Sequence, residues 1–297
     1  MNRARSGSTL LLALWALLLL SAVVFAWLAA LDRGIGAASA ANRRMEARAM
    51  SHSGVTAALH PEIGPGSPHL HARWERRQAY DVTIRSEGAR LNLNYLLAGG
   101  DPVKIALLKD YLALRGMSLP QREAFATNLR DWVAPRGARR LNGWPEGAGG
   151  PPPHRPLQSL EEIPLIAGSA PLVSQPGWKD DLTLSSSGPL DIESAPAELL
   201  ALVPGIGPQR AERFARLREE RTRLRGNRLP FENVAEALAA LGLSPEAFGE
   251  LSGILDFRDP VVRVQSIGTS ADAMQRAEAV VRKAPGTQPR LLLWIEN

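Results

Sequence analysis

An uncharged apolar segment near the N-terminus constrains the fold of this chain more than any other feature. Residues 8–31 form a run of 24 residues without a charged side chain, and Leu, Ala and Val dominate it. At about 1.5 Å of rise per residue, a helix of that length spans about 36 Å, which exceeds the roughly 30 Å of a bilayer hydrocarbon core. The sequence therefore predicts a membrane-spanning helix over residues 8–31.

A cleaved secretory signal is the competing interpretation of the same segment. Arg3 and Arg5 form a basic leader before it, and small residues suited to cleavage follow at 37–41. The apolar part of a signal peptide, however, is about 7–15 residues long, which is shorter than this run. Arginines lie on both sides of the segment, so their distribution alone does not decide its orientation.

Composition excludes several kinds of chemistry. The 297 residues include no Cys, which removes thiol nucleophiles, thiolate zinc sites and disulfides. There are 35 Lys plus Arg against 30 Asp plus Glu, and a net charge of +5 argues against a dedicated nucleic-acid coat. Three His within 60–71 lack acids at ligand spacing, and no nucleophile elbow or nucleotide loop is found. We therefore expect no enzyme, no cofactor and no metal site.

The first half of the chain predicts a helix followed by strands and more helices. The N-terminal helix extends to residue 59, although Gly34 and Gly36 should weaken or bend it. A Pro- and Gly-rich loop follows at 60–78. Alternating apolar residues then predict a β-hairpin with strands at 80–84 and 90–94. Helical spacing predicts two helices, over about 103–114, ended by Gly116, and over about 119–132.

The second half predicts further helices and a return to strands. Helices are expected at 231–241, 245–255 and 271–282, and strands at 261–265 and 290–296. The fold class is therefore α+β. We expect a large helical domain inserted into a small antiparallel sheet whose N- and C-terminal strands pair.

The segment 191–218 has the pattern of a helix-hairpin-helix. Two helices flank a Pro-Gly-Ile-Gly turn in which Gly205 and Gly207 would let an anion approach the backbone and the next helix N-terminus. Residues 208–228 carry eight Arg against three Glu, among them Arg210, Arg213 and Arg216. This pattern suits DNA phosphate binding, but in a membrane-anchored chain of low net charge it favours a packing turn beside a solvated or partner-contacting face.

In their order along the chain, these motifs resemble the minor pseudopilin K family of bacterial type II secretion systems, also called general secretion pathway protein K. The resemblance runs end to end. It includes the leader Arg-Ala-Arg-Ser-Gly at 3–7, the C-terminal strands, and the segments 53–59, 87–94, 129–132 and 198–207.

The resemblance implies processing and topology. A prepilin peptidase would cut after Gly7, leaving Ser8 as a mature N-terminus that is typically methylated, with the N-terminus cytoplasmic and the bulk of the chain periplasmic. Most pseudopilins have Glu at the fifth mature position, whereas this chain has Leu12, as K-type members do. A charge in hydrocarbon is costly unless it is paired, so its absence suits a subunit at the tip, with no partner above it.

The resemblance also implies a division of the chain and a set of partners. Residues 1–7 would be the leader, 8–59 the N-terminal helix, 60–95 and 256–297 the two parts of a pilin-like sheet region, and 96–255 the inserted helical domain. The implied role is to cap the pseudopilus from the inner membrane and promote its assembly and the export of folded proteins. Its partners would be the minor pseudopilins I and J, the major pseudopilin, the assembly platform and the peptidase.

Two departures and one rival accompany the resemblance. The segment 191–196 departs from the Asn-rich version that is usual before the helix-hairpin. Related sequences often place an acid-rich, cation-binding loop after the Asp-Trp pair, but residues 134–143 contain no carboxylate to bind calcium. The rival is a membrane-anchored helix-hairpin-helix DNA receptor of the competence type, which shares the N-terminal anchor and the glycine hairpin but is generally shorter.

Overall fold

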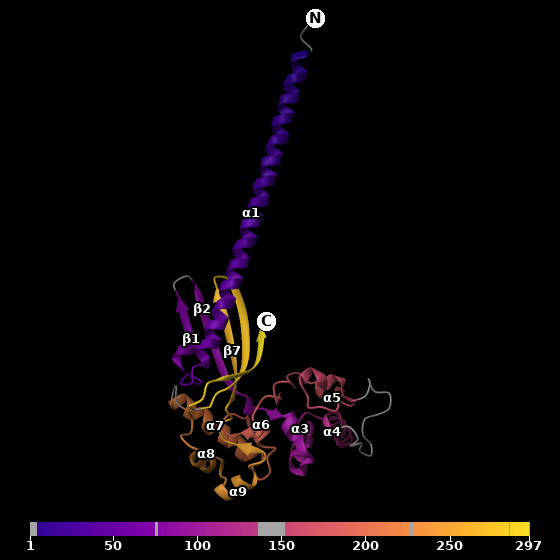
Figure 1. The fold of residues 1–297 in the computed structure, drawn as a ribbon, viewed down its shortest axis with the longest axis vertical. Coiled ribbons are helices and arrows are strands. Elements are labelled where there is room, and N and C mark those ends of the chain that lie inside the picture. The colour runs from indigo at the N-terminus through magenta and orange to yellow at the C-terminus, as the bar shows by residue number, and fades with distance from the viewer. Residues whose placement is uncertain (1–4, 75–76, 136–151, 226–228, 285, 297) are drawn as a thin grey trace.

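The N-terminal helix dominates the shape of the molecule. The computed structural model describes residues 5–74, 77–135, 152–225, 229–284 and 286–296. Helix α1 (Arg5–Leu59) is 55 residues long and passes through Gly34 and Gly36 without a break. Its C-terminal part packs on a sheet, while its N-terminal part projects away from the rest of the chain (Figure 1). The predicted extension of the apolar helix to residue 59 is confirmed.

A five-stranded antiparallel sheet supports α1. Its strand order is β1-β2-β7-β8-β9. The bounds are β1 (His71–Trp74), β2 (Gln78–Ser86), β7 (Val261–Ser270), β8 (Ala273–Arg282) and β9 (Arg290–Glu296). Strands β2 and β7 pair along their length, from Gln78 opposite Ser270 to Ser86 opposite Val262. The expected pairing of N- and C-terminal strands is therefore confirmed.

The predicted hairpin over 80–94 is wrong. After β2 the chain forms the short helix η2 (Glu87–Ala89), and β3 (Leu91–Asn92) then pairs in parallel with β4 (Leu182–Thr183). The Asn92 side chain accepts a hydrogen bond from Tyr95 N and thereby starts helix α2 (Leu93–Leu97). The hairpin partner of β2 is instead β1, which lies in the segment expected to be a loop.

The predicted helix over 271–282 is also wrong, because these residues form β8. Ala, Glu, Gln and Arg favour a helix in isolation, but β8 is paired on both sides, with β7 and β9. Ala277, Ala279 and Val281 point to the face that packs on α1. Tertiary pairing and burial therefore override the local preference.

The contact between α1 and the sheet is close enough to need glycine. A Cβ atom on Gly268 of β7 would lie 2.1 Å from Ala47 O and 2.2 Å from Ser51 N of α1. A Cβ atom on Gly54 of α1 would lie 2.3 Å from Ser266 Oγ of β7. The helix and the strand thus touch backbone to backbone, over small residues spaced three and four apart on α1.

Between β2 and β7 the chain forms an additional helical region with its own core. Its elements are η3 (Ala98–Gly100), α3 (Pro102–Leu114), α4 (Leu119–Val133), η4 (Leu160–Leu165), α5 (Ala170–Val173), β5 (Leu190–Asp191), α6 (Ala197–Leu200), α7 (Gly207–Arg225), α8 (Val234–Leu241), α9 (Pro245–Glu250) and β6 (Leu255–Asp256). The expected helices near 103–114, 119–132 and 231–241 are confirmed. Gly116, with φ 82°, ends α3, since Met117 N donates to Leu112 O.

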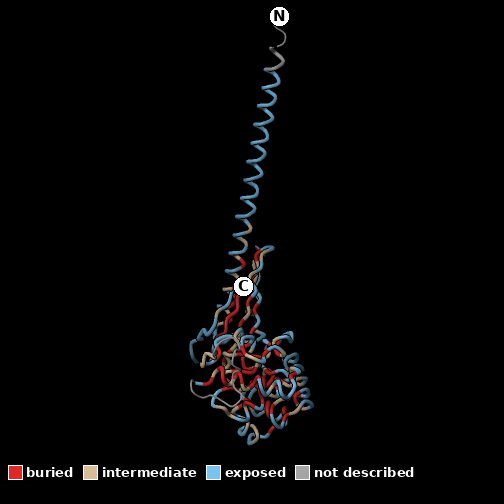
Figure 2. The backbone as a smooth tube through the Cα atoms, turned by 90° about the vertical axis from the view of Figure 1, so that its right-hand side faces the viewer, coloured by how far each residue is buried: buried red, intermediate tan, exposed pale blue. Residues whose placement is uncertain are grey.

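Two separate apolar cores result. The helical region buries Tyr111, Phe125, Phe214 and Phe231 completely, with the Phe214 and Phe231 rings stacked at 5.3 Å. The second core lies between α1 and the sheet. Buried residues are concentrated in the helical region and between α1 and the sheet, while the residues of the projecting part of α1 are exposed throughout (Figure 2). The boundaries proposed for the domains at 59, 95 and 255 stay predictions.

A single lysine caps the C-terminal end of α1. Lys283, which follows β8, donates from Nζ to Ala58 O at 2.8 Å, His60 O at 2.9 Å and Ile63 O at 2.6 Å. These carbonyls lie at and just beyond the end of the helix, where a cation is favoured. Burial lowers the pKa of Lys283. The three contacts join the helix, the loop that follows it and the sheet.

We expect Lys283→Met to lower the free energy of unfolding by about 2 kcal/mol, since three carbonyls lose a charged donor. The control is Lys179→Met, whose exposed pair with Glu161 should contribute less than about 0.5 kcal/mol. Urea unfolding of the detergent-solubilised protein, followed by tryptophan fluorescence, measures both. Equal effects of the two changes would contradict the cap.

Candidate functional site

The projecting part of α1 is the first candidate site, because its surface is apolar on all sides from residue 9 to residue 31, before the exposed Asp32 and Arg33. From Thr9 onward, α1 is long and apolar enough to cross a membrane, and none of its most apolar stretch is buried. Leu12, for example, is 68 % exposed, and Trp15, Phe25 and Trp27 are exposed as well. A helix that is apolar all round and uncovered by its own chain is suited to lipid or to other apolar helices.

The predicted cleavage residues lie at the start of this helix. α1 begins at Arg5, so Gly7 and Ser8 are in its first turns. The side chains of residues 1–8 lie outside the described part of the chain. The small residues at 37–41, suited to signal cleavage, are within the same continuous helix. Cleavage there would separate the apolar segment from a helix whose C-terminal part is packed on the sheet.

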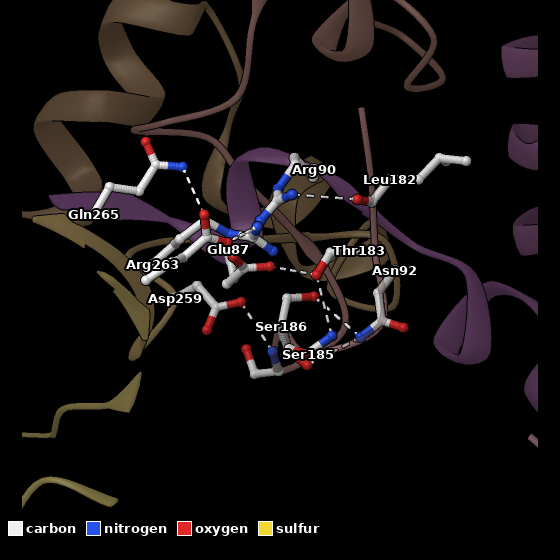
Figure 3. A network of polar contacts seen from close by, with 12 residues as sticks. Glu87, Arg90, Asn92, Leu182, Thr183, Ser185, Ser186, Asp259, Arg263 and Gln265 are labelled. Atoms are coloured by element: carbon white, nitrogen blue, oxygen red, sulfur yellow. Dashed lines mark hydrogen bonds and ion pairs between the residues drawn. The ribbon is translucent and has the colours of Figure 1, made fainter. Parts of the chain in front are cut away.

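A network of charged side chains joins the sheet to the helical region (Figure 3). Its centre is Glu87, which is fully buried. Glu87 accepts from Arg263 Nε of β7 at 2.6 Å, and it also contacts Arg90 and the Thr183 hydroxyl. Arg263 in turn contacts Glu278 of β8. Two carboxylates and two guanidinium groups therefore balance in charge.

Burial and pairing act against each other in this network. Burial lowers the pKa of Arg90 despite the neighbouring Glu87 carboxylate. Burial acts in the same direction on Arg263, but Glu87 and Glu278 outweigh it and raise the Arg263 pKa. Removing one carboxylate would leave cations short of a partner in a poorly hydrated place, so the network depends on being complete.

A second pair of buried carboxylates extends the same joint. Asp191 of β5 accepts from Ser86 Oγ at 2.9 Å and from the backbone N–H of Glu193 and of Arg258, both at 3.0 Å. Asp259 accepts from Ser187 N at 2.9 Å and from Val261 N at 2.8 Å. Burial, with Asp191 adding to it, raises the Asp259 pKa.

The Asp191 and Asp259 carboxylates hold neighbouring backbone segments in position. The Asp191 and Asp259 oxygens described above accept from fixed backbone and hydroxyl donors. In the described residues, no group of three or more His, Asp or Glu is placed to hold a metal ion. The loop compared with a calcium-binding segment, 134–143, lies outside the described residues from 136 onward. We read this joint as the element that fixes the helical region on the sheet.

The glycine hairpin is formed by α6 and α7. Gly205 and Gly207 have φ values of 83° and 70°, in the left-handed region that favours glycine. No atom lies within 4 Å of a Cβ built on either residue, so the conformation rather than close packing requires glycine. Arg210 Nη1 donates to Gly205 O at 3.0 Å and to Gly242 O at 3.2 Å, which ties the turn to the end of α8.

The arginines of α7 divide into two groups. Arg210, Arg218 and Arg221 are engaged within the fold, with Arg218 Nη1 donating to Ala195 O at 2.7 Å and Arg221 pairing with Glu236. The exposed charged residues over 208–224 are three arginines and three glutamates, a net of zero: Arg213, Arg216, Arg223, Glu212, Glu219 and Glu220. The excess positive charge of the sequence is therefore not displayed as a basic face over 208–224.

Several residues that build these sites were not predicted. Glu87 lay in a segment interpreted as a turn, and Lys283 had no motif around it. One available signal was the series of small residues at three- and four-residue spacing on α1, at Ala47, Ser51, Gly54 and Ala58, which indicates a closely packed face.

Comparisons with known proteins identify the fold. No protein-family model matches the chain, and no curated protein matches it. Among solved structures, the chain is similar to one chain of "The Crystal Structure of the GspK-GspI-GspJ complex from enterotoxigenic Escherichia coli Type 2 Secretion System". The TM-score is 0.55 at 14 % sequence identity, and the match covers 100 % of this chain and 99 % of the other. The likeness therefore includes α1, the sheet and the helical region together.

Proposed function

We propose that this protein is a minor pseudopilin of the K type, which caps the pseudopilus of a type II secretion system and promotes its assembly. The observation that carries the proposal is the likeness over the whole length to a chain of a pseudopilin complex. A long helix on a small sheet is a simple arrangement, but the helical region between β2 and β7 is included in the match.

The N-terminal helix supports this function. A subunit that is drawn from a membrane into a fibre needs one apolar helix continuous with its folded part, and α1 has both parts in a single element. Leu12 at the proposed fifth mature position puts no charge in the lipid. This suits a subunit at the tip of the fibre, which has no other subunit above it to pair with such a charge. We propose an inner-membrane location, with the N-terminus cytoplasmic and the rest periplasmic.

The proposed partners are the minor pseudopilins I and J, the major pseudopilin, the assembly platform and the prepilin peptidase. The solved complex contains GspK, GspI and GspJ together. Co-purification of the full chain with its own I and J subunits tests this assignment. The competence-type DNA receptor has less support, because the exposed charges over 208–224 of α7 sum to zero. Duplex DNA binding with a steep salt dependence would favour that receptor instead.

The processing step gives a direct test. We expect membrane-extracted wild-type protein to lack residues 1–7 by intact mass, and Gly7→Ala to keep them and to fail to assemble, because the peptidase reads the residue before the cleaved bond. The matched control is Gly36→Ala in the same helix, where no atom lies within 4 Å of a Cβ. That variant should be processed normally.

Two other masses would contradict the proposal. Wild-type protein that retains residues 1–7 would exclude a prepilin leader. Wild-type protein cut within 37–41 would identify residues 8–31 as part of a secretory signal.

A further inference from the structure

The two edges of the five-stranded sheet differ sharply. Strand β1, at one edge, is four residues long and includes His71 and Arg73. Strand β9, at the other edge, is seven residues long, and five consecutive large apolar residues separate Arg290 from Glu296. Figure 1 shows β9 at the border of the sheet, and its outer side pairs with no strand of the described chain.

Soluble proteins usually protect an edge strand by making it short or by placing charges or proline along it. Strand β1 is short and carries charge, whereas β9 has no charge or proline between its ends and only the bulge at Leu292 interrupts it. Leu291, Leu292 and Leu293 are 52 %, 42 % and 43 % exposed, and Ile295 is 37 % exposed. The pairing of β8 with β9 shifts by one residue at a bulge between Val280 and Val281. Leu293 is opposite Val280 and Leu291 is opposite Val281, so these two leucines point to opposite faces and apolar surface lies on both sides of this edge.

The strand is held in place from the α1 side. Glu296 pairs with Arg48 of α1, and His52 Nε2 lies 3.0 Å from Glu296 Oε1. The His52 ring also meets the Trp294 ring edge-on, with centroids 5.0 Å apart. A strand that is already ordered needs little further ordering when another strand pairs with it.

The charges at the other end of β9 indicate what would pair there. Arg282 of β8 and Arg290 of β9 are directly opposite in the register, and both are exposed. Like charges placed directly across a strand pair destabilise it. Within the described residues neither arginine has an ion-pair partner. A carboxylate on an added strand would relieve this repulsion.

We propose that the free edge of β9 binds an extended segment of a partner protein as a sixth strand. The segment is apolar at alternating positions and carries an acidic residue opposite Arg290, the arginine on the edge strand itself. Main-chain hydrogen bonds would supply affinity, and the apolar and acidic side chains would supply specificity. The open edge does not depend on the proposed function, but the choice of a different protein as its partner rests on the proposed membrane insertion of α1.

A second copy of this chain fits the edge less well. Antiparallel pairing of two β9 strands about Leu293 would place Arg290 opposite Glu296, which already pairs with Arg48. It would also direct the two α1 helices in opposite directions, so that both could not enter one membrane. The added strand therefore belongs to a different protein.

The test uses the full chain in detergent micelles and fluorescein-labelled heptapeptides of alternating Val and Thr, with Glu or Lys at one end. Anisotropy titrations should show tighter, saturable binding of the Glu-ended peptide. Arg290→Glu should weaken binding of the Glu-ended peptide by about fivefold and should increase the affinity for the Lys-ended peptide, as expected for a cross-strand charge pair. The matched control is Arg213→Glu on α7, which is exposed and lies in the helical region, outside the sheet. It should change neither affinity.

Two further measurements locate the binding. Leu293→Lys should abolish it without altering thermal unfolding, since this side chain is 43 % exposed. Hydrogen exchange of wild-type protein with the Glu-ended peptide should slow within β9. Three results would overturn the proposal: no saturable binding to the wild type, equal effects of Arg290→Glu and Arg213→Glu, or concentration-dependent dimerisation that protects β9 without peptide.

Discussion

Replacing Gly268 with alanine is expected to destabilise the protein by about 3 kcal/mol or more, as a severe overpacking substitution. The new Cβ atom would lie 2.1 Å from Ala47 O and 2.2 Å from Ser51 N. Both atoms belong to the backbone of α1, so no side-chain rotation can relieve the overlap. The helix must move away from β7, which opens the core between α1 and the sheet.

Urea unfolding and hydrogen exchange of residues 47–58 would measure this effect. The control is Gly249→Ala in α9, where no atom lies within 4 Å of the new Cβ. That change should be neutral, or stabilising by up to about 1 kcal/mol, because alanine favours a helix over glycine. If Gly268→Ala unfolded at the same urea concentration as the wild type, the close packing of α1 on β7 would be disproved.

Glu87→Ala is expected to destabilise the protein by about 3–5 kcal/mol, the usual effect of removing one member of a buried ion-pair network. Glu87 is fully buried and joins Arg90, Arg263 and Thr183. Its removal would leave two guanidinium groups without their shared carboxylate. The helical region would then be held less firmly on the sheet.

The matched control for this change is Glu198→Ala. The Glu198 side chain is 66 % exposed and lies 3.5 Å from Arg115. An exposed pair of this kind contributes less than about 1 kcal/mol, so the midpoint of urea unfolding should move little. A similarly small shift for Glu87→Ala would show that the network is not needed to hold the two parts together.

The elements that could be predicted from sequence are those whose signal is local and long. Helix α1 could be predicted from the uncharged run at 8–31 and the segment that follows it, because apolar length and the absence of helix-breaking residues are properties of the segment itself. Gly116 marked the end of one helix, and Pro120, which suits the first turn of a helix, marked the start of the next, for the same reason. The sheet pairing of β2 with β7 followed from alternation at both ends of the chain.

Two of the errors arose where local preference and tertiary environment disagree. Residues 271–282 have the composition of a helix, but α1 covers one face of β8 and strands flank both of its edges. Residues 90–94 alternate like a strand, but Asn92 caps a helix whose Leu93, Leu96 and Leu97 are buried. In short segments, the same apolar residues satisfy either period, and the surrounding structure decides between them.

The same division applies to the candidate sites. The apolar helix, the glycine turn at Gly205 and Gly207 and the arginine-rich segment were all found in the sequence. The structure shows that Arg210, Arg218 and Arg221 are engaged within the fold and that the exposed charges over 208–224 of α7 balance. Sequence alone could count these charges, but it could not say which of them face solvent.

By itself, the sequence determined that this chain has one long apolar helix, an α+β fold and no thiol chemistry, because each depends on composition or on the spacing of neighbouring residues. Only the tertiary structure decided that Gly268 meets the α1 backbone, that Glu87 joins two cores and that β9 leaves an apolar edge open. These features depend on contacts between residues far apart in the chain, and no local pattern encodes the distance between such residues.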